Sequence, residues 1–237
     1  MSKTNYKKPI ILAVLFLLPV IFLLFLYPST HNYQALDIIK GDIKELSDFK
    51  SVTKDSIQLS ERITILGFLG KNPNSKTLTA LNLKELIYDK FQGFKKFQVV
   101  MVVSIEAQEK LNKLKKELYQ YNELKYWDFA VASDDAIKEL YKSLRSEDTL
   151  DNFLASEEVF IIDKERNQRG RIDDRDDREI EKQIPVYGLY SYNCIEVAEL
   201  KNKMSEDLRV LFTEYRQKRK GTFNSTTRRA SDIRTNE

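Results

Sequence analysis

The sequence predicts a mixed α/β domain built on one central sheet, and three observations support this fold class. Apolar, β-branched runs alternate with amphipathic stretches through the middle of the chain, as strands and crossover helices do. A strand-turn-strand segment follows them, so the sheet is expected to contain antiparallel as well as parallel pairs. Of the 237 residues, 42% are apolar, which is enough to fill a core of ordinary size.

The N-terminal segment is expected to be a transmembrane anchor. Residues 9–27 read PIILAVLFLLPVIFLLFLY and carry no charge; as a helix they nearly span a hydrocarbon core of roughly 30 Å. A cleaved signal peptide is the alternative, but its apolar region is usually shorter and ends in a small-residue cleavage site. Lys3, Lys7 and Lys8 precede the segment, whereas no lysine or arginine follows it closely. The positive-inside rule therefore predicts a cytoplasmic basic N-terminus over 1–8 and an external body.

The segment after the anchor is expected to be a tether over 28–45, and the domain itself to occupy 46–185. At its start, 48–52 and 56–59 are predicted to form a small hairpin around the turn TKD. The run RITILGF at 62–68 is apolar and β-branched, which is typical of a strand buried on both faces.

The rest of the domain continues the alternation of strands and helices. Apolar residues recur at helical spacing over 75–91, and Ser75 is the expected N-cap. Further strands are predicted at 96–104 and 126–132, further helices at 106–121 and 133–144, and a hairpin at 157–174. This order of elements matches a thioredoxin-like fold.

The C-terminal part, 186–220, adds an aromatic-rich connection and an extra amphipathic helix. One face of that helix is apolar, and it is expected to pack either on the domain or on a partner: Val197, Leu200, Met204, Leu208, Leu211 and Tyr215. The last 22 residues carry seven basic and two acidic side chains, and the segment 221–237 has hardly any apolar content. We therefore expect a basic tail that is disordered when alone.

Five segments of the body resemble the Sco/SenC family over residues 45–185. The segments are ITILGF, LNLKELIYDKF, FQVVMVVSIE, YWDFAVAS and SEEVFIIDKERNQRGRIDD. Members of this family are membrane-anchored proteins of thioredoxin fold that assist copper-site assembly in cytochrome oxidase. The resemblance implies the same fold, and it implies contacts with oxidase subunits or their assembly factors.

The chain departs from this family at the positions that carry its chemistry. Family members have a cysteine pair in the first strand-to-helix loop and a histidine before the late strand. Here Asn72 and Lys76 stand near the cysteine positions, Pro73 is retained, and Ala155 stands near the histidine position. Amide, ammonium and methyl groups supply neither the thiolates and imidazole of such a copper site nor a sulfur nucleophile. We therefore expect a degenerate site with no catalytic residue, metal or cofactor.

Other enzyme chemistry finds little support in the sequence. His31, the only histidine, follows the apolar segment closely and is interpreted as an interfacial polar residue, which leaves the body without a histidine-based triad. Cys194 has no partner for a disulfide and is interpreted as a small buried residue. The acidic run 173–179 contains Arg175 and Arg178, and ion pairing explains it better than a calcium loop does.

Two functions remain open. The first is a noncatalytic accessory protein of respiratory-complex assembly, held in the inner membrane with a periplasmic domain and acting through protein contacts. The alternative is a structural or interaction subunit of an unrelated membrane complex, which uses the C-terminal helix and the basic tail. The candidate interaction residues, which suit anionic lipid headgroups better than nucleic acid, are Arg216, Lys218, Arg219, Lys220, Arg228 and Arg229.

Overall fold

The computed structural model of the chain describes residues 7–26, 35–54, 56–120 and 123–221. The chain divides into two units, and the first of them contains helix α1 (Lys7–Leu26), which has Pro19 inside it. The large apolar side chains between Ile11 and Phe22 are 48–68% exposed. Among the described residues, no helix combines the length and hydropathy that crossing a membrane requires.

Several sequence predictions fall on parts of the chain outside the described residues. These are the first six residues of the basic N-terminus, residues 28–34 of the predicted tether with His31, and the basic tail from residue 222 with Arg228 and Arg229. They stay predictions.

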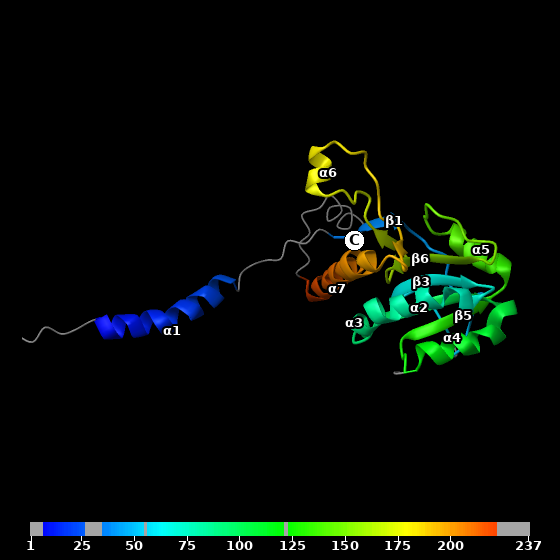
Figure 1. Ribbon diagram of the computed structural model, residues 1–237, viewed down its shortest axis with the longest axis horizontal. Helices are drawn as coiled ribbons and strands as arrows, with labels where there is room; N and C mark the ends of the chain where they lie inside the picture. The colour runs from blue at the N-terminus through cyan, green and yellow to red at the C-terminus, as the bar shows by residue number, and fades with distance from the viewer. Residues whose placement is uncertain (1–6, 27–34, 55, 121–122, 222–237) are drawn as a thin grey trace, which may run out of the picture. The chain divides into compact units, whose positions relative to one another are not determined.

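The second unit, residues 35–223, is the domain, and its described residues form one eight-stranded sheet (Figure 1). The strand order is β1-β7-β6-β3-β4-β5-β2, and β8 pairs with β6 outside this row. The strands are β1 (Asp37–Lys40), β2 (Lys50–Ser51), β3 (Ile63–Gly70), β4 (Phe97–Ser104), β5 (Trp127–Ala132), β6 (Ala155–Ile162), β7 (Gln168–Gly170) and β8 (Tyr192–Asn193).

The three central runs of the sequence are parallel neighbours in the sheet. β3 pairs with β4 and β4 with β5 in parallel, whereas β6 lies antiparallel on the other side of β3. Every residue of β3, β4 and β5 is buried, as their continuous apolar character requires. The predicted hairpin is present as β6 and β7. The mixed α/β sheet predicted from the order of elements is confirmed.

Helices cover both faces of the sheet. A helix runs from α2 (Thr77–Leu83) through a π-helical turn (Lys84–Tyr88) into α3 (Asp89–Phe91), after a 3-10 turn at Pro73–Lys76. Ser75, the expected N-cap, lies inside that 3-10 turn instead. The remaining helices are a 3-10 segment (Ile105–Lys110), α4 (Leu111–Leu118), α5 (Asp134–Lys142), α6 (Asp177–Glu181), a π-helical segment (Glu199–Met204) and α7 (Ser205–Lys220). α6 has no buried residue and stands clear of the sheet (Figure 1).

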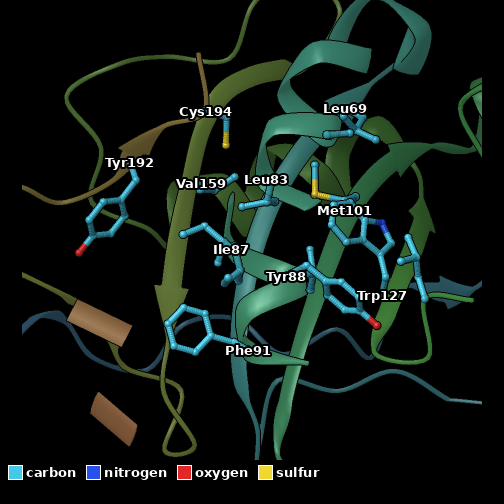
Figure 2. Close-up of a cluster of buried hydrophobic side chains, with 14 of the residues drawn as sticks. Leu69, Leu83, Ile87, Tyr88, Phe91, Met101, Trp127, Val159, Tyr192 and Cys194 are labelled. Carbon is cyan, nitrogen blue, oxygen red and sulfur yellow. The ribbon is translucent and has the colours of Figure 1, made fainter. Parts of the chain in front are cut away.

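Two apolar cores fill the space between the helices and the sheet. Successive side chains of a strand point to opposite faces, so Ile63 and Ile65 join one core while Leu66 and Phe68 join the other. The first core packs the sheet against α2, α4 and α7, and the second packs it against α5 and the segment 43–59. Figure 2 shows part of the first core, where the rings of Tyr88 and Trp127 meet edge-on at 5.7 Å.

The N-terminal part of the domain differs from the prediction. β1 lies in the segment predicted to be a tether, and it pairs with β7, so the sheet begins before residue 46. The predicted hairpin of 48–52 with 56–59 is wrong, because β2 pairs with β5 instead. Both strands are short edge strands whose partners lie far along the sequence, and local pattern carries no sign of such pairing.

The C-terminal helix is part of the core and not an addition to it. Leu200, Met204, Leu208 and Leu211 are fully buried and belong to the first core. Four of the six predicted stripe residues therefore pack on the chain's own domain, and Tyr215 packs against the same core while partly buried. Val197 does not belong to the buried stripe, since it is 45% exposed.

A buried ion-pair cluster connects α7 to the sheet and to the start of the domain. The guanidinium of Arg169, in β7, lies 2.9 Å from an oxygen of Asp163 and 2.6 Å from an oxygen of Glu214. It also donates to the backbone carbonyl of Leu36 at 2.9 Å. Arg169, Asp163 and Glu214 are at most 4% exposed, so these charges are compensated by one another and not by water.

Candidate functional site

The candidate site lies where β3 and β4 end and β6 begins. These three ends share one edge of the sheet, because β6 runs antiparallel to the other two strands. Open α/β sheets usually bind ligands outside the carboxyl ends of their parallel strands, and the parallel strands β3 and β4 end at this edge. We call residues 71–76, which follow β3, and 151–155, which lead into β6 and include its first residue, the loop edge.

The two halves of the loop edge touch closely at Gly70. Its backbone has φ of +58°, and a Cβ there would lie 1.9 Å from the carbonyl oxygen of Phe153. The backbone N–H of Lys71 donates to that same oxygen at 2.7 Å. Only glycine permits this approach, so the sequence at residue 70 fixes how the loop after β3 meets the turn before β6.

The turn before β6 is organised by Asp151. One carboxylate oxygen of Asp151 accepts from the backbone N–H groups of Phe153 and Ala155, at 2.8 and 2.9 Å. Leu154, between them, has φ of +59°, an uncommon conformation for a branched side chain. Ala155 itself is 1% exposed and pairs with Leu69 of β3.

The four predicted positions lie at the loop edge: Asn72, Pro73 and Lys76 follow β3, and Ala155 begins β6. The ammonium of Lys76 lies 3.4 Å from a carboxylate oxygen of Glu157 and 3.9 Å from one of Asp151. Its side chain is only 15% exposed. Both acidic residues lie within four positions of Ala155. The ion pairs of Lys76 therefore connect the loop after β3 to the residues around Ala155. Pro73 is buried in the 3-10 turn between Asn72 and Lys76.

Lys71 makes a second ion pair that the sequence did not indicate. Its ammonium contacts Asp134 at the start of α5 and lies 3.4 Å from Glu106 after β4. The hydrogen bond from Lys71 lowers the pKa of Asp134, and Ser104 also donates to this carboxyl at 2.8 Å. Taken one by one, Lys71, Glu106 and Asp134 look like ordinary surface residues in the sequence. Only their positions, each just after a strand that ends at this edge of the sheet, could have indicated that they lie close together.

The described residues near the loop edge offer ammonium, carboxylate and amide groups. No group of three or more His, Cys, Asp and Glu side chains in the described ranges is arranged to hold a metal ion. Cys194 is fully buried in the first core beside β6, and burial raises the pKa of its thiol well above the ordinary value (Figure 2). The interpretation of Cys194 as a buried structural residue is confirmed. It is far from nucleophilic at neutral pH, because the thiolate is the reactive form.

The acidic run 173–179 is paired within itself only in part, because Arg175 pairs with Asp173 inside the run whereas the partners of Asp174 lie outside it. Arg175 contacts the carboxylate of Asp173 at 2.7 Å, and Asp174 contacts both Arg171 and Lys203.

Exposed apolar side chains flank the loop edge. Ile105 follows β4 and is 58% exposed, Phe153 precedes β6 and is 55% exposed, and Leu78 in the first turn of α2 is 56% exposed. Lys71 is bonded to the backbone of Phe153 and paired with Glu106, the neighbour of Ile105. Exposed apolar side chains with polar and charged groups beside them are typical of protein-contact surfaces.

The candidate interaction residues of α7 lie at the other end of the sheet. Arg216, Lys218 and Arg219 line a cavity beside the first residue of β3, whereas Lys220 is exposed at the end of the helix. The ammonium of Lys218 lies 2.8 Å from the buried carboxylate of Glu214.

No protein family and no curated protein matches the sequence. Among solved structures, the chain is similar to BsSco, described as a member of the Sco family of cytochrome c oxidase assembly proteins, with a TM-score of 0.48 and 13% identity over 75% of this chain and 98% of that one. It is similar to ScoI of Arabidopsis thaliana with copper bound, with a TM-score of 0.40 and 15% identity over 71% and 98% of the two chains. It is also similar to the thioredoxin domain of a thiol-disulfide oxidoreductase from Bacteroides vulgatus, with a TM-score of 0.37 and 15% identity over 63% and 100% of the two chains.

Proposed function

We propose that this protein is a noncatalytic, membrane-anchored accessory protein that supports the assembly of a respiratory complex, such as cytochrome oxidase, through protein–protein contacts. The observation that carries the noncatalytic part is Lys76. It stands where a sulfur ligand is expected, and it is held by Asp151 and Glu157 beside the position where an imidazole is expected. A soft metal ion or a disulfide requires sulfur at this place, and an ammonium supplies neither a ligand nor a nucleophile.

The respiratory-complex part of the proposal rests on the resemblance of the five sequence segments to the Sco/SenC family. The anchor and the inner-membrane location rest on the uncharged residues 9–27 and the three lysines before them. The contact surface consists of the loop edge, which includes the exposed Phe153, and the two exposed apolar side chains that flank it, Leu78 and Ile105.

The alternative, an unrelated membrane-complex subunit that uses the C-terminal helix, has less support. Its main element was the apolar stripe of that helix, and four of the stripe's residues are fully buried in the domain's own core. A partner that binds α7 could therefore contact only the exposed basic residues of this helix, such as Arg216 and Arg219.

Copper titration tests the noncatalytic part of the proposal. We expect the reduced full chain, in neutral detergent, to show no stoichiometric tight Cu(I) binding, because the loop edge presents ammonium and carboxylate groups in place of thiolates. Competition against a chromogenic Cu(I) chelator measures this. Tight one-to-one binding that disappears when residues 70–77 are changed would refute the noncatalytic assignment.

Substitution of the exposed apolar residues tests the contact surface. In the triple variant L78S/I105S/F153S, we expect the partner that copurifies with the tagged chain from solubilised membranes to be recovered several-fold less. The triple variant I172S/I180S/V186S is the matched control, since its residues are 47–59% exposed near α6, away from the loop edge. Thermal melts of both variants should stay within a few degrees of the wild type, because neither change opens a core.

Three outcomes of this experiment would contradict the proposal. Equal recovery of the partner with both triple variants would remove the loop edge as the contact surface. Identification of the partner as part of a secretion or motility apparatus would remove the respiratory assignment. Recovery of the chain in the soluble fraction and not with membranes would remove the anchor.

A further inference from the structure

A cavity of about 550 Å³ lies at the end of the sheet opposite the loop edge. Three segments far apart in the sequence build it: the turn 93–96 before β4, the β6–β7 turn and the last two turns of α7. Ile63, the first residue of β3, forms part of its lining. This volume is within the range of small-molecule sites. We call this cavity the basic pocket.

The lining of the basic pocket is strongly cationic. Two acidic residues, Glu61 and Glu165, face six basic ones, which are Lys95, Lys96, Lys164, Arg216, Lys218 and Arg219. Five of the six make no ion pair within the described part of the chain, namely Lys95, Lys96, Lys164, Arg216 and Arg219, whereas Lys218 pairs with Glu214. Lys71 and Lys76 at the loop edge are matched by nearby carboxylates, whereas the basic pocket gathers cations from segments far apart in the sequence on one concave surface.

The aromatic ring of Tyr215 lies beside two of the six cations. The ammonium of Lys164 lies 4.4 Å, and that of Lys218 5.3 Å, from the centre of the Tyr215 ring. The Tyr215 hydroxyl is held in turn by the carboxylate of Glu165. Phe94 and Phe212 stack at 4.1 Å and form an apolar wall. Two like charges, those of Lys164 and Lys218, are thus held at one rigid ring. The arrangement of charge in the pocket therefore does not depend on flexible side chains alone.

Crowded like charges cost free energy unless an anion compensates them, and a concave site with low-dielectric walls concentrates their field. Phosphate groups carry one to two charges in a small volume, and lysine and arginine are their usual partners in proteins. We propose that the basic pocket binds a phosphate-bearing anion, which is either a free phosphate compound or a phospholipid headgroup. This inference does not depend on the assembly function, because the pocket and the loop edge lie at opposite ends of the sheet.

Calorimetric titration of the full chain in neutral detergent tests the proposal with two probes. Inorganic tripolyphosphate represents a free phosphate compound, and short-chain phosphatidylglycerol represents a headgroup, with short-chain phosphatidylcholine as its neutral counterpart. We expect saturable binding of at least one anionic probe, and at least tenfold weaker binding in the variant K95Q/K96Q. R216Q/R219Q is a second variant with the same expected loss. None of the four side chains is buried, so these variants keep the fold.

The double variant K113Q/K116Q is the matched control, since it removes two exposed charges from α4, outside the pocket. Its affinity should equal that of the wild type. Binding of tripolyphosphate alone supports a free phosphate compound, and binding of phosphatidylglycerol but not phosphatidylcholine supports a headgroup. The absence of saturable binding of both anionic probes up to about 1 mM would overturn the proposal. So would binding that the pocket variants leave unchanged, or that the control weakens equally, since the anion would then bind elsewhere on the chain.

Discussion

Replacing Arg169 by methionine is expected to destabilise the domain by about 3–5 kcal/mol, because the change leaves buried carboxylates without their counter-charge. Asp163 and Glu214 are at most 1% exposed, so water cannot take the place of the guanidinium. Glu214 keeps Lys218 as a partner, which places the expected loss toward the lower end of this range. Methionine fills much of the volume, so the loss measures charge more than packing.

The single tryptophan provides the measurement. Trp127 is 1% exposed in the first core, so its fluorescence reports unfolding of the domain in a urea titration. The control is K138M, which breaks an exposed pair with Asp135 at 3.7 Å and should change stability by less than about 0.5 kcal/mol. If the free energy of unfolding of R169M lies within about 1 kcal/mol of the wild-type value, the buried ion-pair cluster does not hold α7 to the sheet as described.

Replacing Gly70 by alanine is expected to destabilise the domain by about 3 kcal/mol or more, the second large effect. The left-handed backbone at this residue alone costs alanine about 1–2 kcal/mol. The rest arises because the new methyl group would lie 1.9 Å from the carbonyl oxygen of Phe153 and 2.5 Å from the carbonyl carbon of Leu154. Both contacts are backbone atoms, which cannot rotate away, so the turn before β6 must move.

Gly93→Ala is the matched control for this substitution. Gly93 is exposed, and a methyl group added there would meet no neighbouring atom within 4 Å, so alanine should change stability by no more than about 0.5 kcal/mol. The same urea titration compares the two variants. Because Gly70 fixes the loop edge, G70A should also weaken recovery of the partner. Equal stability of G70A and G93A would contradict the close approach seen at Gly70.

Much of the fold follows from the sequence because its central elements have strong local patterns. β3, β4 and β5 are continuous apolar runs, and the helix beginning near residue 75 shows its own periodicity, so each was predicted within a few residues of its bounds. β1, β2 and β8 have two to four residues each, and their pairing partners lie far away in the chain. Only the assembled sheet specifies such strands, so the local pattern of the sequence did not indicate β1 and β8 and gave β2 the wrong partner.

The candidate site was predicted only in part, for a related reason. The resemblance identified Asn72, Pro73, Lys76 and Ala155, and the structure places all four on one edge of the sheet. It gave no indication that Asp151 and Glu157 hold Lys76, or that Lys95 and Lys96 join the basic residues of α7 in one cavity. These charges are separated by tens of residues, and nothing in their local sequence distinguishes them from ordinary solvated lysines and carboxylates.

The contact of Arg169 with both Leu36 and Glu214 has a consequence for the order in which the domain matures on the ribosome. The guanidinium joins the first residues of the domain to its last helix, so neither end can be completed without the other. A nascent chain that has not yet released Leu208 and Leu211 leaves the first core incomplete, even when α2 and α4 already cover their part of the same face. Synthesis must therefore pass α7 before the apolar side chains of this core are fully covered, and until then they are exposed to aggregation.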